Sequence, residues 1–293
     1  MRTVATASRG HGVSVPSTSK NLDDELLPAT RMLIMRSYLV DSFTDTPFGG
    51  NPAAVVLLDE PADPAWMQAV AAEFNQSETA FVVTGGDEHA AKPLRWFSPT
   101  TEVDLCGHAT LAAAHVLGGS QRFNTRSGEL TCTATTDGTV EMDFPVRPNE
   151  PVDVPVVAAL GDIAPERVIA VARSNTDLLV HLDDAGLVRE LRPDLSEVLR
   201  ITERGVIVTA ASDRPEVDFV SRFFAPAVGA PEDPVTGSAH CSLAPWWAER
   251  LGRTELVGEQ ASARGGTVRA RLEGRRVVLG GRAVTVLDGT LAA

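Results

Sequence analysis

Short apolar segments separated by turn signals run along most of the chain, and only a few segments carry their apolar residues at helical spacing. Residues 64–74 are one of these, and their pattern predicts a helix that ends near Asn75. Apolar runs at residues 111–117 and 243–251 predict two further helices, and residues 195–199 predict a short one.

Strand-sized segments make up most of the remaining pattern. They are residues 38–43, 53–58, 80–83, 94–97, 130–135, 140–144, 168–172, 178–182, 205–210 and 219–224. Near the C-terminus, glycines separate three further segments that predict closing antiparallel strands. These are residues 268–272, 276–279 and 283–287, separated by Gly274 and by Gly280 with Gly281. The whole pattern predicts a mixed α+β fold with mostly antiparallel strands.

A short motif occurs twice and precedes two of the predicted helices. The copies span residues 97–110 and 224–240. Each begins with Phe-x-Pro, passes through a loop containing Asp, and reaches a glycine, Gly107 or Gly237, followed by His or Ser and then Ala. A helix that begins at glycine leaves backbone N–H groups accessible, and such helix ends bind anions. The repeat predicts two related halves whose helix starts face one ligand, and a carboxylate-bearing small molecule is the first ligand to consider.

A proline-rich segment marks the expected crossing between these halves. Residues 147–155 contain three prolines and little apolar content. We therefore predict an N-terminal half at residues 35–148 and a C-terminal half at residues 149–293. Residues 1–34 are rich in small, polar and charged side chains and lack the apolar core of a signal peptide. We interpret them as a disordered tail, or as sequence translated upstream of the true start.

Composition narrows the class of protein. Hydrophobic residues at 43% and charged residues at 22% are typical of a globular chain with a sizeable core. The net charge of -13 argues against nucleic acids and acidic membrane surfaces as partners, and no apolar stretch approaches the roughly 20 residues that span a bilayer. Cys106, Cys132 and Cys241 lack the spacing of a disulfide framework or a zinc site, which indicates a reducing cytoplasm and implies no metal.

Two residues of the first half are placed for proton chemistry. Glu78 lies at a predicted helix-to-strand junction beside an apolar strand, where partial desolvation raises a carboxyl pKa toward values useful for proton transfer. His108 follows Gly107 at the first helix start, where the positive helix end disfavours imidazolium and a neutral ring can donate a hydrogen bond. A solvated surface position for Glu78 and a capping or core position for His108 are the structural alternatives.

The second copy of the motif adds Asp233 and Ser238. Asp233 precedes a proline at a turn and Ser238 stands at a helix start, so either could only cap the helix. Their place in a repeated frame favours a functional role, because capping does not require the pairing of Gly-His with Gly-Ser. A serine hydrolase is disfavoured, since residues 236–240 lack the G-x-S-x-G turn of a nucleophilic serine.

Four separated segments resemble the phenazine-biosynthesis PhzF-type isomerase family. They are Asp41-Ser42-Phe43 with Phe48 to Val56, Asn75-Gln76-Ser77-Glu78-Thr79 with Ala80 to Val82, Leu94 to Thr100 with Val103 to Thr110, and Pro231 to His240. They occur in the family's order, and the resemblance runs from Ser37 to the C-terminus. It implies a diaminopimelate-epimerase-like fold with two similar halves, each a curled sheet around a central helix, and an active site between them.

The resemblance also implies roles for individual residues. Glu78 corresponds to the family's proton-shuttling carboxylate. The residues that surround the substrate are His108, Asp233 and Ser238. The backbone N–H groups that hold its carboxylate are those at Gly107 and Gly237. No cofactor is implied, and the chain is expected to form a homodimer.

Related cofactor-independent epimerases use two opposed cysteines, one at the start of each central helix. Cys106 occupies the first such place, but residues 233–236 offer no partner thiol. A two-thiol racemase is therefore disfavoured, and Cys106 is interpreted as a small apolar residue. The resulting hypothesis is a cofactor-free isomerase of specialised metabolism. An amino-acid-type epimerase or racemase with another second base, and a non-catalytic small-molecule-binding homologue, are its alternatives.

Overall fold

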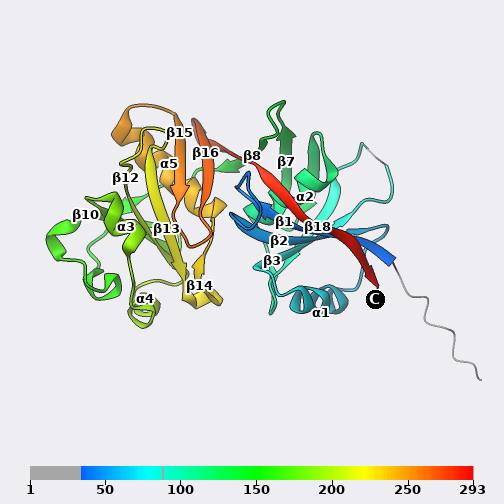
Figure 1. The fold of residues 1–293 in the computed structure, drawn as a ribbon, viewed down its shortest axis with the longest axis horizontal. Coiled ribbons are helices and arrows are strands. Elements are labelled where there is room, and N and C mark those ends of the chain that lie inside the picture. The colour runs from blue at the N-terminus through cyan, green and yellow to red at the C-terminus, as the bar shows by residue number, and fades with distance from the viewer. Residues whose placement is uncertain (1–33, 88, 293) are drawn as a thin grey trace, which may run out of the picture.

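The computed structural model describes residues 34–87 and 89–292 (Figure 1). The predictions for residues 1–33 lie outside this part of the chain, and the first strand begins at Ile34. The helices are α1 (Pro64–Phe74), α2 (Gly107–Leu117), α3 (Ala185–Glu190), α4 (Leu195–Ile201) and α5 (Gly237–Leu251). Short 3-10 turns are η1 (Val157–Leu160), η2 (Pro165–Arg167) and η3 (Pro226–Val228).

Strands supply most of the regular structure. The strands before residue 146 are β1 (Ile34–Ser42), β2 (Asn51–Leu58), β3 (Glu78–Val83), β4 (Lys92–Phe97), β5 (Glu102–Val103), β6 (Gln121–Thr125), β7 (Gly128–Ala134) and β8 (Val140–Pro145). The later strands are β9 (Glu150–Pro151), β10 (Val168–Ser174), β11 (Asp177–Leu182), β12 (Gly205–Ala211), β13 (Phe219–Ala225), β14 (Ala230–Asp233), β15 (Glu255–Gln260), β16 (Gly266–Glu273), β17 (Arg276–Gly281) and β18 (Ala283–Ala292).

The strands pair in two groups that lie side by side in Figure 1. In the α2 group, neighbours follow the order β18, β1, β2, β3, β4, β6, β7 and β8, and only β2 with β3 and β4 with β6 run parallel. In the α5 group the order is β9, β10, β11, β12, β13, β15, β16 and β17, and only β11 with β12 and β13 with β15 run parallel. Antiparallel pairing of β8 with β17 joins the groups. The fold is α+β, as predicted.

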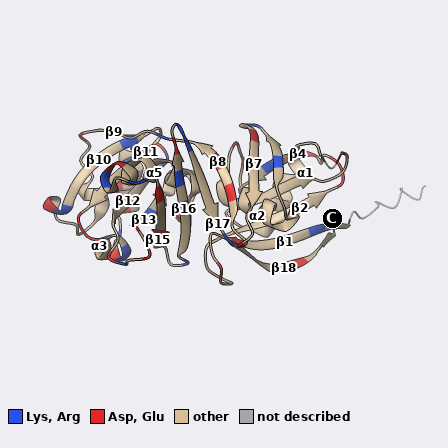
Figure 2. Ribbon diagram, turned by 90° about the horizontal axis from the view of Figure 1, so that it is seen from above, with Lys and Arg blue, Asp and Glu red and all other residues tan. Residues whose placement is uncertain are grey.

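Helix α2 is the centre of the core of its group. It contains no Asp, Glu, Lys or Arg (Figure 2), and all its residues from His108 to Ala114 are buried. A helix that is apolar on every side must be surrounded by other elements. The core cluster that contains α2 includes Val55 of β2, Trp96 of β4 and Met142 of β8, and it extends to Cys241 of α5.

Helix α5 is packed in the same way but contains a proline. Pro245 has no N–H group, so it cannot donate to the carbonyl of Cys241 one turn earlier. The backbone N–H of Arg147 donates to that carbonyl instead, at 3.0 Å, and the side chain of Asn149 donates to the carbonyl of Ser242 at 2.8 Å. The predicted crossing segment therefore packs directly on α5 and satisfies a carbonyl that the proline leaves without a helical partner.

One prediction about strand pairing was wrong. The segment at 283–287 does form a strand, β18, but this strand pairs with β1 rather than with β17, in the register Ile34 to Ala292. Only β16 and β17 form the expected hairpin, which turns at Gly274 with φ +62. A Cβ atom on Gly281 would lie 2.4 Å from the ring of Phe43 and 2.8 Å from Leu111. The chain therefore crosses at this glycine to the α2 group, and the last strand completes that group.

The outer helices are confirmed where the pattern was clear. Helix α1 spans the predicted residues, is capped by Asp63 and ends at Asn75 in the left-handed conformation. It covers a separate cluster that includes Met67 and Phe81. Helix α3 and strands β5, β6, β9, β14 and β15 were not predicted. No helix in the described ranges has the length and apolar character needed to cross a membrane.

Candidate active site

The starts of the two central helices meet, as the repeated motif predicted. A Cβ atom built on Gly107 would lie 3.4 Å from the Cα of Gly237, and one built on Gly237 would lie 3.5 Å from the Cα of Gly107. Neither N-cap residue, Cys106 or Thr236, makes a side-chain capping bond. Two positive helix ends therefore converge on one point where neither helix is closed by a capping side chain.

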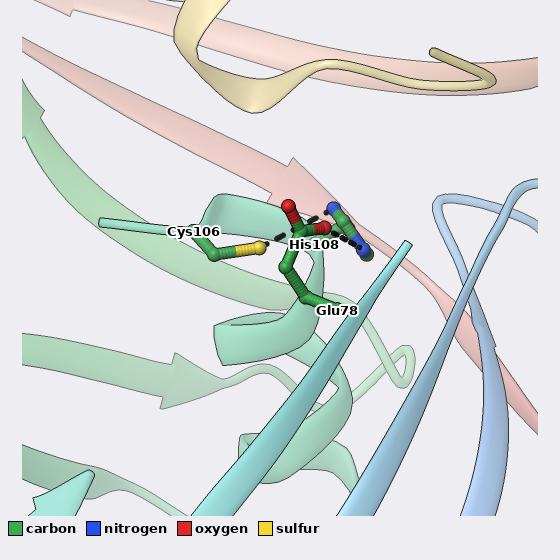
Figure 3. Close-up of side chains that lie close together, drawn as sticks. All are labelled: Glu78, Cys106 and His108. Carbon is green, nitrogen blue, oxygen red and sulfur yellow. Dashed lines mark hydrogen bonds and ion pairs between the residues drawn. The ribbon is translucent and has the colours of Figure 1, made fainter. Parts of the chain in front are cut away.

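Glu78 is the first residue of β3 and lies beside the start of α2 (Figure 3). Its side chain is 22% exposed. Burial and the negative charge of Asp233 raise its pKa to about 7, while a hydrogen bond from the Cys106 thiol acts in the opposite direction. A carboxyl group with this pKa is divided between acid and base near neutral pH, which suits it to both removal and return of a proton.

His108 places a buried ring against Glu78. Its Nε2 atom lies 3.2 Å from Oε2 of Glu78, but the two are not aligned as a hydrogen bond, so Nε2 has no partner among the described residues. Burial lowers the pKa of His108 to about 3, which keeps the ring neutral. The hydroxyl of Ser42 donates to the His108 carbonyl at 2.8 Å and anchors this turn.

Asn51, the first residue of β2, determines the tautomer of this ring. Its amide nitrogen lies 3.2 Å from Nδ1 of His108, and the thiol of Cys106 lies 3.5 Å from the same atom. The amide nitrogen of Asn51 carries hydrogens and cannot accept, so we assign Nδ1 as the acceptor and place the ring proton on Nε2. The ring therefore holds a buried N–H donor beside Glu78 that a bound ligand can accept from.

Asp233 closes the other side of the cluster. Its Oδ1 atom accepts from the Asn51 amide at 2.7 Å and its Oδ2 atom from the Thr236 hydroxyl at 2.5 Å. Burial raises the pKa of Asp233 to about 6, while these hydrogen bonds and the charge of Arg204 act in the opposite direction. Two carboxyl groups with raised pKa values thus share one site and influence each other's ionisation.

Ser238 lies apart from these contacts. It is the second residue of α5, and its Oγ atom accepts from Nη2 of Arg204 at 3.0 Å. Within the described residues, no hydrogen bond joins its side chain to Glu78 or His108. The structure therefore brings Glu78, His108 and Asp233 into one cluster and places Ser238 at its edge, beside Gly237.

Cys106 is part of the cluster, although its sequence context suggested only packing. Its thiol, the carboxylate of Glu78 and the imidazole of His108 each offer one atom, and these atoms lie within 4.8 Å of one another (Figure 3). Such a set resembles the ligands of a zinc ion. Burial and the charge of Glu78 raise the thiol pKa well above its usual value, so the thiol is protonated at neutral pH and can donate a hydrogen bond.

Sequence reasoning missed Asn51 and Arg204. Asn51 lies in one of the segments that carry the family resemblance, but no role was predicted for it. Arg204 precedes β12 and had no local signal at all. A cavity of about 420 Å³ lies elsewhere, lined by Thr44, Arg264 and Arg282 among others, and contains no residue of this cluster.

Comparison with known proteins identifies relatives over most of the chain. A family model described as phenazine biosynthesis-like protein matches residues 40–289. An uncharacterized isomerase of Halalkalibacterium halodurans is 46% identical over 276 residues, which cover 89% of this chain and 99% of the relative. An uncharacterized isomerase of Pseudomonas aeruginosa is 48% identical over 263 residues, which cover 87% of this chain and 97% of that relative.

Solved structures give the same result. A phenazine biosynthesis protein of the PhzF family from Enterococcus faecalis superposes with a TM-score of 0.82 at 39% identity, covering 88% of this chain and 99% of that one. A hydroxyproline epimerase from Agrobacterium vitis superposes with a TM-score of 0.58 at 12% identity, covering 88% and 92%. The second likeness shows that the fold is shared beyond the PhzF proteins.

Proposed function

Because this chain belongs to the phenazine biosynthesis-like family of PhzF proteins, we propose that it is a cofactor-independent isomerase. The proposed reaction moves a proton between carbons of a small conjugated substrate that carries a carboxylate. Relatives that match over nearly their whole length bear the name isomerase, which supports this reaction class. A role in specialised metabolism, a cytoplasmic location and a homodimeric state belong to the same proposal.

The observation that carries the proposal is the environment of Glu78. This carboxyl group is partly exposed and has a pKa of about 7 in a site that is otherwise buried. In its ionised form it takes a proton from a carbon acidified by the conjugated system. The C–H bonding electrons move into that system and an O–H bond forms on Glu78. The carboxyl group then gives the proton to another carbon. An electron pair of the conjugated system forms the new C–H bond, and the O–H bonding electrons return to the Glu78 carboxylate.

The other groups stabilise the charge that develops on the substrate. The N–H donor on Nε2 of His108 and the backbone N–H groups near Gly107 and Gly237 are fixed before the substrate arrives, so they need no reorganisation during the reaction. In this proposal Asp233 orients a polar substituent of the substrate and relays a proton. Because Glu78 must be ionised to start the reaction, kcat/KM is expected to rise as the pH passes through about 7.

The strand pairing supports a further part of the proposal, that the chain consists of two related halves. The orientations from β1 to β8 repeat from β10 to β17 in the same order, and each series surrounds one central helix. In this interpretation the active site lies between the halves, where Gly107 meets Gly237.

The test is isotope exchange in deuterium oxide with a panel of cyclohexadiene and related conjugated carboxylic acids. The wild-type chain is expected to place deuterium on the carbon that gains hydrogen. Glu78→Gln keeps the shape of the side chain and removes the base, so a loss of about 10²-fold or more is expected. Glu73→Gln, on the exposed face of α1, is the matched control. Exchange that survives in Glu78→Gln at more than a tenth of the wild-type rate would place the base elsewhere.

An epimerase is the second candidate, because Asp233 is a second carboxyl group with a raised pKa beside Glu78. It would be the second base in place of the missing thiol. A product that differs from the substrate in configuration alone would favour this candidate. Tight binding without exchange in any compound would favour a non-catalytic binding protein.

A further inference from the structure

Arg204 reaches the start of α5 from a different part of the chain. Its Nε and Nη2 atoms donate to the two carboxylate oxygens of Asp177 at 2.7 and 2.5 Å. Nη2 also donates to Oγ of Ser238 at 3.0 Å. The side chain is 27% exposed, whereas Asp177 is fully buried. One guanidinium group thus links a buried carboxylate to the helix end where the repeated motif predicts an anion.

The local fold holds this side chain in place. Asp177 begins β11 and lies in parallel register with Gly205, the residue after Arg204. Gly205 has no side chain, and a Cβ atom there would lie 2.5 Å from the ring of Phe223. The ring fills this space, and the guanidinium carbon of Arg204 lies 4.9 Å from its centroid. Phe223 pairs in turn with Asp233 of β14, so Arg204 lies beside the carboxylate cluster.

A buried ion pair explains only part of this arrangement. Asp177 needs a counter-charge, because a buried, unpaired carboxylate costs several kcal/mol. The pair occupies Nε and Nη2, while no described residue accepts a hydrogen bond from Nη1. Arg204 also lowers the pKa of Asp233, so its charge acts on the site itself. A partly exposed guanidinium edge with free donors remains beside Ser238.

We propose that Arg204 recognises the anionic carboxylate of the substrate. Nη1 donates directly to that carboxylate. The bond from Nη2 occupies a lone pair of Ser238, which directs the serine O–H toward the same anion. The site therefore selects small carboxylates over their neutral amides. This inference rests on the proposed function, because it takes the start of α5 as the binding site for the substrate.

The test compares benzoate with its neutral isostere benzamide, by calorimetry at pH 7 and constant ionic strength. The wild-type chain is expected to bind benzoate at least about tenfold more tightly, in line with a charge-assisted hydrogen bond. Arg204→Gln combined with Asp177→Asn removes both members of the ion pair. The second cation near Asp177, Arg147 at 3.9 Å, is 25% exposed and remains in contact with solvent. This double variant keeps the helix-end N–H groups, so it is expected to lose most of the preference for benzoate but not all of it. Asp177→Asn alone keeps the cation and is expected to keep the preference, and an unchanged melting temperature confirms folding.

A tenfold preference that survives in the double variant would overturn the proposal, as would a wild-type chain that does not distinguish the two compounds. Failure of the proposed function would give a different result. Loss of benzoate preference in the double variant, together with no isotope exchange by wild type, would refute the isomerase and leave the role of Arg204 intact. If isotope exchange depends on Glu78 but the double variant keeps the full preference for benzoate, the isomerase is supported and the role of Arg204 is refuted.

Discussion

At the scale of single residues, Glu78 and His108 have opposite effects on how stability depends on pH. The folded chain raises the pKa of Glu78 from 4.5 to about 7, so between these values it binds more protons than the unfolded chain, and stability falls as the pH rises. Burial lowers the pKa of His108 from 6.5 to about 3, so for this residue stability falls as the pH drops below 6.5. Burial of these two groups therefore lowers the stability of the folded chain both above and below neutral pH.

Glu78→Gln separates the two contributions. Because the amide carries no charge to bury, the variant is expected to be more stable than wild type at pH 8, on the order of 2 kcal/mol. The difference should shrink toward pH 5, where Glu78 is protonated in the folded chain. Urea unfolding at both pH values measures it, with Glu73→Gln as control. Lower stability of Glu78→Gln at pH 8 would mean that the ionised carboxylate is favourably paired.

Cys106→Ala distinguishes the isomerase from a thiol-dependent racemase. The thiol is buried and protonated, so its loss removes a small side chain and one hydrogen bond to Glu78, with an expected cost on the order of 1 kcal/mol in stability. Turnover is expected to change by less than tenfold, and alkylating reagents should have little effect. Complete loss of exchange in this variant would make Cys106 a proton carrier.

At the scale of elements, the segment that crosses between the strand groups donates the hydrogen bond that the proline in α5 cannot donate. Pro245→Ala restores an N–H group that competes with Arg147 for the carbonyl of Cys241. The amide of Arg147 should therefore exchange with solvent roughly fivefold faster, which corresponds to one hydrogen bond of about 1 kcal/mol. Hydrogen exchange followed by mass spectrometry measures this change. Pro64→Ala, at the first turn of α1, is the control, and equal acceleration in both variants would contradict the explanation.

At the scale of the whole molecule, the last strand completes the sheet that begins the chain. Deletion of residues 283–293 uncovers the whole of β1 along its pairing with β18, so a large loss of melting temperature and a tendency to aggregate are expected. Deletion of residues 1–33 is the control truncation. It should leave the melting temperature and isotope exchange unchanged. Scanning calorimetry of both truncations tests the pair. An unaffected C-terminal truncation would show that β18 contributes little to the fold.

The sequence by itself determined the elements whose signals are local. Three such signals each depend on neighbouring residues: the helical spacing of apolar residues at 64–74, the glycines at the ends of the central helices, and the repeated motif. Helices α1, α2 and α5 lie close to the positions that these signals predicted. The repeat also predicted that the two helix starts would face one ligand, and in the structure Gly107 lies against Gly237. The candidate residues Glu78, His108 and Asp233 came from these motifs and from the family resemblance.

Only the tertiary structure decided how distant segments combine. The pairing of β18 with β1 depends on where the chain crosses at Gly281, which no local pattern encodes. Hydrogen bonds at the site also join residues far apart in sequence. Asn51 bonds to His108 and Asp233, and Arg204 bonds to Ser238. The raised pKa of Glu78 likewise has two causes, burial and the charge of Asp233, a residue of the distant second motif. Both causes arise only when the strands have packed around the helices.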